Sequence, residues 1–269
     1  MDFFKIIKPT SVLAPYIKHY WIFQSDIKDL RRLTPIGSVE LVFHRGDAIL
    51  SSVNNDMEPL GFIRGQKIGY YDAIPTGTVD MIAVIFQPHG FRSVFNIPTC
   101  ELYENLTPLD MIGVKSLSEL QDKIGNTKDN DLCIKFIDDF FLKQLSITKE
   151  YNFNRMDAVI SVINTHPIIK FTSLAETACL GYKQFKRIFS EYVGINPQDF
   201  FRIVRFQRSL SLLSRKPNMN FTHLAYECGF YDQSHLIHEF KNFTNYNLGN
   251  YLTNNSPYSD YFSPCITIY

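Results

Sequence analysis

The strongest constraint on this chain is a pattern that occurs twice in its C-terminal part, over residues 174–194 and again over residues 224–245. Each copy begins with Leu-Ala and carries an apolar pair eleven or twelve residues later, Phe185/Phe189 in the first and Leu236/Phe240 in the second. Because side chains four residues apart share one face of a helix, each pair marks the buried face of a longer helix. Each copy therefore predicts a short helix, a tight turn and a longer helix, which is the helix-turn-helix arrangement.

Residues that cap helices stand at the expected ends of both copies. Ser173 and Glu176 have the spacing of a capping box for the first short helix, and Thr222 can cap its counterpart. Gly181 and Asp232 occupy the same aligned position and can cap the longer helices. The two units are therefore expected to begin and end in the same way.

A further helix joins the two units. Asn196 followed by Pro197 is a strong helix start, and the apolar pattern continues to about Ser214, which is long enough to span both units. Residues 170–216 contain nine Lys and Arg against three Asp and Glu, although the whole chain contains 27 of each kind. Such a local excess attracts a polyanion, and a solvated helical surface explains it equally well.

The chain before these helices has the pattern of a β-rich domain. Apolar runs at residues 20–23, 39–44 and 81–86 are separated by turn formers and predict strands. A short helix is expected to open at Ser116–Glu119, another over residues 131–145, and a polar linker over residues 146–154.

These patterns predict an α+β fold class. Residues 1–150 would form a β-rich regulatory domain, for which a barrel-like form is one option, with a helical bridge at its end. Residues 151–255 would form an all-α domain with two helix-turn-helix motifs joined by a long helix, and residues 256–269 a C-terminal tail.

Composition excludes several classes of protein. With 45% hydrophobic and 20% charged residues the chain is typical of a globular protein. Its longest apolar run, residues 81–86, is far shorter than a membrane-spanning helix, and no secretory signal is expected at its start. The five cysteines are scattered and form no C-x-x-C, so neither a disulfide framework nor a zinc ribbon is expected, and a cytoplasmic location fits best.

The two helical units also carry a specific signature. Its residues are Leu174-Ala175, Phe185-x-Arg187-x-Phe189 and Gly194-Ile195-Asn196-Pro197 in the first unit, and Ala225-Tyr226-Glu227-Cys228-Gly229-Phe230, Asp232-Gln233-Ser234-His235 and His238-Glu239-Phe240-Lys241 in the second. With them, residues 171–252 resemble the DNA-binding domain of the AraC/XylS family of bacterial transcription regulators. The second unit departs from the family at its end, where Asn245 and Leu248 replace the usual Gly and Pro. Because Asn tolerates the left-handed conformation, we expect the turn to be retained.

The N-terminal half resembles, more weakly, a sensor-like domain that precedes this module in some members of the family. The matching segments are residues 35–43, 61–66, 86–90 and 106–110.

The resemblance implies a sequence-specific regulator that places the longer helix of each unit in the major groove of double-stranded DNA. The expected DNA-binding residues are Lys183, Gln184, Lys186 and Arg187 in the first unit, and Gln233, Ser234, His235 and His238 in the second. A small-molecule effector, RNA polymerase and a second copy of the chain are further partners that the resemblance allows.

The alternative is a small-molecule-binding protein or an enzyme with a degenerate helix-turn-helix module. The sequence has no Gly-rich phosphate loop, G-x-S-x-G or H-E-x-x-H motif. His235 and His238 stand three residues apart beside Glu239, but a third ligand in good geometry for a metal is missing. No metal, cofactor or catalytic residue is therefore predicted. Glu40 and Arg64 are polar residues in apolar segments, and a ligand pocket, a paired salt bridge and an exposed strand face explain them equally well.

Overall fold

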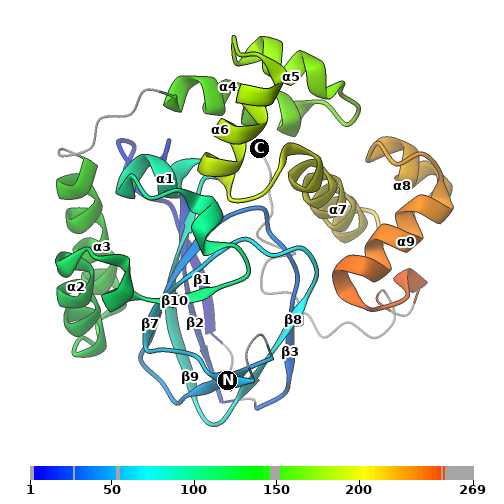
Figure 1. Ribbon diagram of the computed structural model, residues 1–269. Helices are drawn as coiled ribbons and strands as arrows, with labels where there is room; N and C mark the ends of the chain where they lie inside the picture. The colour runs from blue at the N-terminus through cyan, green and yellow to red at the C-terminus, as the bar shows by residue number, and fades with distance from the viewer. Residues whose placement is uncertain (1–2, 27, 53–54, 146–151, 250, 252–269) are drawn as a thin grey trace.

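A computed structural model describes residues 3–26, 28–52, 55–145, 152–249 and 251. Figure 1 shows a β-rich N-terminal half, with helices α2 and α3 beside it and helices α4 to α9 arranged around its upper end and one side. The strands are β1 (Phe3–Ile7), β2 (Ile17–Ser25), β3 (Arg31–Leu33), β4 (Glu40–His44), β5 (Ile49–Ser51), β6 (Asp56–Met57), β7 (Gly61–Arg64), β8 (Tyr71–Pro75), β9 (Val79–Phe86) and β10 (Leu106–Pro108).

The strands form two antiparallel sheets. The larger has the order β1-β2-β9-β4-β7-β10, and the smaller has the order β3-β8-β5-β6. Within the described residues both sheets are open, so the barrel-like option for this half is wrong and the two sheets face each other instead. The three expected strand segments lie in β2, β4 and β9.

The larger sheet is the middle of three layers, which explains its continuous apolar runs. Trp21 and Phe23 point into the core between the two sheets, whereas Tyr20 and Ile22 belong to the core on the other face. That second core is completed by helices, including the buried Ile137 and Phe141. A strand that is buried on both faces needs apolar side chains at every position, as residues 20–23 have.

Helices connect the sheets to the C-terminal half. They are α1 (Gly90–Phe95), η1 (Thr99–Leu102), η2 (Leu109–Ile112), α2 (Lys115–Gly125) and α3 (Asn130–Leu145). The helix expected to open at Ser116–Glu119 exists, but α2 begins at Lys115 and has Val114 at its N-cap with no side-chain cap, so that capping box was wrong. Most of the expected linker, residues 146–151, lies outside the described residues, and its last two residues belong to α4.

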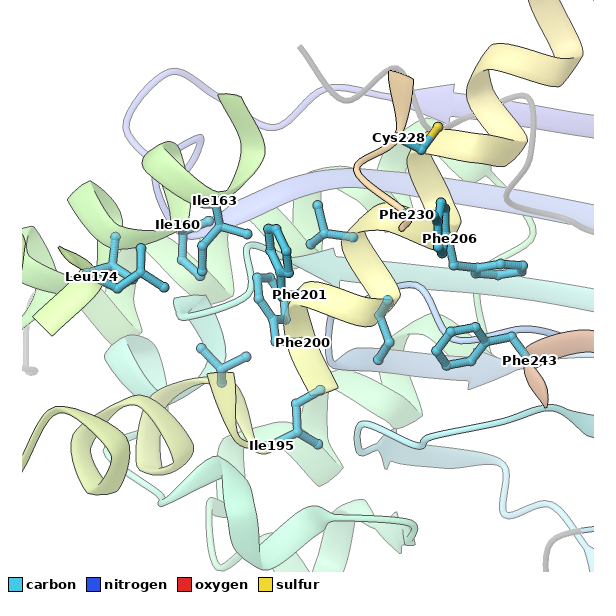
Figure 2. Packing of buried hydrophobic residues seen from close by; sticks show 14 of the residues in the cluster. Ile160, Ile163, Leu174, Ile195, Phe200, Phe201, Phe206, Cys228, Phe230 and Phe243 are labelled. Carbon is cyan, nitrogen blue, oxygen red and sulfur yellow. The ribbon is translucent and has the colours of Figure 1, made fainter. Parts of the chain in front are cut away.

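The C-terminal half packs around a central helix, α7. Its helices are α4 (Phe153–Thr165), α5 (Phe171–Thr177), α6 (Tyr182–Val193), α7 (Pro197–Arg215), α8 (Phe221–Glu227) and α9 (Gln233–Thr244). Figure 2 shows Phe200, Phe201 and Phe206 of α7 among apolar side chains from the surrounding helices, which form one continuous core. Asn196 caps α7 by accepting hydrogen bonds from the amides of Gln198 and Asp199, as its sequence predicted.

The two halves are in contact through both polar and apolar groups. Ile68 and Tyr103 of the N-terminal half pack on the helical core, and the ring of Tyr16 contacts that of Phe153 with centroids 4.9 Å apart. In the part of the chain that the structure describes, no helix is long and apolar enough to cross a bilayer.

Candidate nucleic-acid interface

Both helix-turn-helix units use the same turn. In the first, the amides of Cys179 and Leu180 donate to the carbonyls of Glu176 and Ala175; in the second, Gly229 and Phe230 donate to Tyr226 and Ala225. This is the Schellman arrangement, in which one residue adopts the left-handed conformation after the helix. Cys179 has φ = 52° and Gly229 has φ = 78°, so a cysteine occupies in the first unit the position that a glycine occupies in the second.

The start of each helix differs in part from the prediction. Helix α5 begins at Phe171 with Lys170 at its N-cap, and the Ser173 hydroxyl donates to the carbonyl of Lys170 instead of capping. Helix α8 is capped by Asn220, whose side chain accepts from the amide of Thr222. The predicted caps at Ser173 and Thr222 were therefore wrong, because both short helices begin earlier than expected.

The longer helices begin as predicted. Gly181 stands at the N-cap of α6, and Asp232 caps α9 by accepting from the amide of His235. At the other end of α9, Asn245 has φ = 58° and Leu248 is fully buried, so the end of the second unit is retained.

Helix α7 is tied to the second unit by two arginines. Arg202 Nε and Nη2 donate to the two carboxylate oxygens of Glu239 on α9, at 2.7 and 3.0 Å. Burial alone would raise the pKa of the Glu239 carboxyl, but the hydrogen bonds and charge of Arg202 hold it below its usual value. Arg205 donates to the carbonyl of Gly229 and its guanidinium stacks between the rings of Phe201 and Phe230. Arg205 therefore has a structural role in the turn.

The predicted face of α6 points away from the core. Lys183, Gln184, Lys186 and Arg187 are all exposed, and Phe185 and Phe189 are fully buried on the opposite side. Lys183, Gln184 and Arg187 line a surface hollow together with Gly181 and Tyr182. Arg187 is 64% exposed and donates to Glu191 at 2.6 Å. A surface pair of this kind stabilises a helix by only about 0.3–0.5 kcal/mol, so Arg187 can be released at little cost.

The predicted face of α9 is less uniform. Ser234 and His238 are exposed, and Gln233 accepts from the hydroxyl of Thr222 at 2.8 Å. His235 is half-buried, lies edge-on to the ring of Phe230, and accepts from the amide of Tyr231. The structure thus brings Gln233, Ser234 and His238 to the surface and uses His235 mainly within the turn.

Exposed tyrosines beside the two faces were missed by sequence reasoning. Tyr182 at the start of α6 is 43% exposed, and Tyr231 in the turn before α9 is 84% exposed. Each tyrosine stands next to a predicted N-cap, Gly181 or Asp232, and outside the apolar positions that form the buried face of the helix. This position was the feature of the sequence that indicated exposure.

Glu40 and Arg64 form an ion pair, and both side chains also line a small pocket. Because both are largely buried, the exposed strand face was wrong, whereas the salt bridge is confirmed. Their positions are directly opposite on β4 and β7, and Arg64 also pairs with Glu58, whose carboxylate accepts from His44 Nε2 at 3.0 Å. Burial raises the pKa of Glu40 despite the nearby Arg64. The pKa of Glu58 is instead lowered, because the charge of Arg64 and the contact with His44 overcome the effect of burial.

The N-terminal half also holds the far ends of both longer helices. Gln66 and Thr99 donate to the carbonyls of Val193 and Tyr192 in the last turn of α6. Arg32 donates to the carbonyl of Thr244 at the end of α9 at 3.3 Å. The carbonyls of a last helical turn have no partner within the helix, so these contacts satisfy them and fix the position of each helix.

The guanidinium of Arg32 is itself held firmly. It pairs with Asp72 and stacks on the rings of Tyr70 and Tyr246, 4.2 and 4.8 Å from their centroids. Because Tyr246 follows α9 and Tyr70 precedes β8, this stack also joins the two halves.

Comparisons with known proteins agree with this geometry. A family model described as a helix-turn-helix domain matches residues 174–254, and one described as a domain of unknown function (DUF6597) matches residues 5–108. The chain therefore carries an AraC-type helix-turn-helix domain, which places it in the class of DNA-binding transcription regulators. No curated protein matches the chain.

The solved structures that are similar to the chain include two of ToxT and one of another regulator. ToxT from Vibrio cholerae, at 1.65 Å resolution, is 13% identical with a TM-score of 0.48, and the match covers 87% of this chain and 97% of that one. Wild-type ToxT from strain SCE256 with an unsaturated fatty acid bound is 13% identical with a TM-score of 0.47, covering 86% and 93%. An AraC-type transcriptional regulator from Chromobacterium violaceum is 16% identical with a TM-score of 0.35, covering 38% and 96%. All three TM-scores lie below 0.5, and the assignment of the domain rests on the family model.

Proposed function

We propose that the protein is a sequence-specific regulator that reads double-stranded DNA with α6 and α9 in successive segments of the major groove. The observation that carries this proposal is that one helix, α7, holds both units while Lys183, Gln184 and Arg187 of α6 and Ser234 and His238 of α9 remain exposed. A recognition helix contacts base edges with residues near its N-terminus, which is the part of α6 that these exposed residues occupy.

The first unit is the principal reader in this proposal. Arg187 suits guanine and Gln184 suits adenine through paired hydrogen bonds, and Lys183 shares their face. Lys186, displaced from that face, lies nearer to phosphate. The pairing of Arg187 with Glu191 is weak, so the guanidinium can leave Glu191 and bind a base instead.

The second unit contributes fewer charges. Gln233, Ser234 and His238 are its proposed base contacts, with the remaining ring nitrogen of His235 at their edge. Since Thr222 donates to Gln233 Oε1, the side-chain amide of Gln233 remains available as a donor to a base acceptor. Its contribution to affinity is expected to be smaller, because none of these groups carries a permanent positive charge.

The N-terminal half is proposed to regulate this reading. Its contacts with the ends of α6 and α9 make the relative position of the two helices depend on residues such as Gln66 and Arg32. A ligand, RNA polymerase or a second copy of the chain that moves these residues would change how well both helices fit DNA at once.

The test is selection of duplexes from a random pool with the full chain, followed by titration of the selected duplex at several salt concentrations. We expect enrichment of a two-part site whose halves lie about one helical turn, roughly 34 Å, apart. Affinity should fall steeply and linearly on a logarithmic salt scale, because Lys and Arg displace counterions from phosphates. A pool that remains unenriched would reject the proposal and favour a ligand-binding protein with a degenerate module.

A further inference from the structure

Phe153, the first residue of α4, contacts two aromatic rings of the N-terminal half. The ring of Tyr16, just before β2, and the ring of His89, at the N-cap of α1, each have a centroid 4.9 Å from that of Phe153. Pairs of rings at this separation attract each other and restrict each other's orientation. Phe153 therefore fixes the start of α4, the first helix of the C-terminal half, to the N-terminal half.

The imidazole of His89 lacks hydrogen bonds in this contact. His89 is 1% exposed, and neither of its ring nitrogens has a hydrogen-bond partner within the described residues. The carboxylate of Asp157, on α4, lies 3.8 Å from Nε2, which is beyond hydrogen-bond distance. Because a buried polar group without a partner is costly, the start of α4 is held less firmly than its aromatic contacts alone would hold it.

The groups that surround the ring do not favour a proton on it. Asp157 is 62% exposed, so water weakens its attraction for a positive charge. On α1, the guanidinium of Arg92 lies over the ring of Tyr192, and the Ser93 hydroxyl donates to the backbone carbonyl of His89 instead of its ring. Burial therefore lowers the pKa of His89 to about 4. Once the start of α4 leaves, the ring reaches water and its pKa returns to about 6.5.

We propose that the contact between Phe153 and His89 is an acid-sensitive latch, in which protonation of the imidazole releases the start of α4 while both halves stay folded. The proton binds the released state more tightly, so acid shifts the equilibrium toward release. At pH 7 the imidazole is mostly neutral in both states and the latch is closed. At pH 5.5 the ratio of released to closed molecules is about eightfold higher than at pH 7, because the ring gains its proton in the released state only.

Release of the latch would act on the first DNA-reading unit. Met156 and Ile160 of α4 are buried in the same core as Leu174 of α5 and Phe185 of α6. A loosened start of α4 would therefore weaken the support of α6, and affinity for DNA would fall in acid. This consequence rests on the proposed function, whereas the latch itself does not.

The experiment measures hydrogen exchange in the full chain by mass spectrometry at pH 7 and pH 5.5. The peptides of interest cover residues 153–165, and their rates are corrected for the intrinsic effect of pH. We expect the protection of α4 to fall about eightfold between the two pH values. His89→Phe keeps an aromatic ring against Phe153 but cannot take up a proton, so its protection should change less than about twofold.

His19→Phe is the matched control. His19 is also buried, and burial, with the charge of Lys18 as a smaller cause, lowers its pKa to about 4. It lies on β2 on the same face as Trp21, which belongs to the core between the two sheets. If α4 exchanges by release of the latch, His19→Phe should keep the eightfold change. If α4 exchanges only when the whole chain unfolds, both histidines contribute, and the two variants should reduce the change equally.

A second variant tests the other side of the contact, in case His89→Phe does not fold as judged by circular dichroism. Phe153→Ala opens the contact, so protection of α4 should fall about tenfold at pH 7 and its dependence on pH should shrink. Phe171→Ala removes a different ring, which contacts that of Phe201 on α7 with centroids 5.8 Å apart, and should keep the dependence on pH.

Three results would overturn the proposal: equal protection of α4 at the two pH values, equal effects of His89→Phe and His19→Phe, or a dependence on pH that persists in both His89→Phe and Phe153→Ala. Titration of the selected duplex at both pH values, with the unaltered protein and His89→Phe, is a separate measurement. A latch that responds to pH in a chain that binds no DNA would reject the proposed function alone. DNA binding by a chain whose α4 does not respond to pH would reject the latch alone.

Discussion

The side-chain amide of Gln66 donates to the backbone carbonyl of Val193 at 2.9 Å, across the boundary between the two halves. Together with the Thr99 hydroxyl on Tyr192 and the Arg32 guanidinium on Thr244, it places a donor from the N-terminal half at the carboxyl end of each longer helix. The carboxyl ends of α6 and α9 are thus held by the N-terminal half, whereas the proposed contact residues lie nearer their amino ends.

The contact of Thr99 predicts a measurable loss of stability. Thr99→Val removes the donor to the buried carbonyl of Tyr192 and should lower the free energy of unfolding by about 1–2 kcal/mol. Thr76→Val is the control, because Thr76 makes the same kind of bond to Ala48 at an exposed site where water can replace it. Urea denaturation measures both. Equal losses in the two variants would show that the hydrogen bond of Thr99 contributes no more to the free energy of unfolding than an exposed hydrogen bond does.

The two units should contribute unequally to DNA binding. Arg187→Ala should weaken binding to the selected duplex by about 1–3 kcal/mol and relax base preference in one half of the site. His238→Ala should cost less, because an imidazole cannot form the paired hydrogen bonds to one base that a guanidinium forms. Titration of fluorescent duplex at fixed salt measures both. If His238→Ala were the more damaging change and Arg187→Ala left base preference intact, the first unit would not be the principal reader.

Removing the partner of Arg187 should strengthen binding. Glu191→Gln releases the guanidinium and removes a negative charge beside the proposed interface, so affinity for the duplex should rise about twofold to fivefold. The gain should shrink at high salt, where surface charges are screened. Asp139→Asn, an exposed change on α3, controls for the change in net charge. A similar gain in both variants would assign the effect to net charge alone.

The shared turn predicts opposite effects for two exchanges. Cys179→Gly should raise the free energy of unfolding by about 0.5–1 kcal/mol, because it relieves a non-glycine residue at φ = 52°. Gly229→Ala should lower it by about 2 kcal/mol or more, since the added Cβ would also lie 1.9 Å from the carbonyl oxygen of Pro167. Thermal unfolding monitored by circular dichroism distinguishes the two, and a destabilised Cys179→Gly would contradict this account of the turn.

Acid should destabilise the fold through buried histidines. Burial lowers the pKa of His89 to about 4, and Asp157, 3.8 Å away and mostly exposed, does not offset this effect. The unfolded chain therefore binds a proton near pH 6.5 that the folded chain does not bind until about pH 4, so stability is lost as the pH falls through this window. Between pH 7 and pH 5 the loss from His89 is about 2 kcal/mol.

The variant His89→Phe should show a correspondingly smaller loss in urea denaturation at the two pH values. His166→Phe, a change at an exposed histidine, should behave like the unaltered protein. An unchanged pH dependence in His89→Phe would show that burial of this imidazole does not cause the loss of stability at low pH.

The sequence predicted elements that depend on local periodicity and missed features that depend on packing. The run at residues 20–23 indicated a buried strand, but nothing local to it indicates that β2 lies beside β9, some sixty residues away. Apolar spacing located both longer helices, whereas Ser173 and Thr222 were wrong as caps because the start of a short helix varies by a turn without altering its buried face.

The candidate interface was predictable to a similar extent. Phe185 and Phe189 define the buried face of α6, and the exposure of Arg187 follows from them. The half-buried state of His235 does not, because it depends on the position of Phe230 in the preceding turn.

Gly37, which contacts α7, limits how this protein can be recombined with others. It has φ = 71°, and a Cβ at this position would lie 3.3 Å from the ring of Phe200. The N-terminal half is therefore shaped to one aromatic residue on one particular helix. In a chimaera that joined residues 1–145 to another helix-turn-helix domain, a different side chain at position 200 would leave a gap or a clash there. Such a hybrid would contain both halves without the contact at Gly37 and Phe200, one of the contacts through which we propose that the N-terminal half acts on DNA reading.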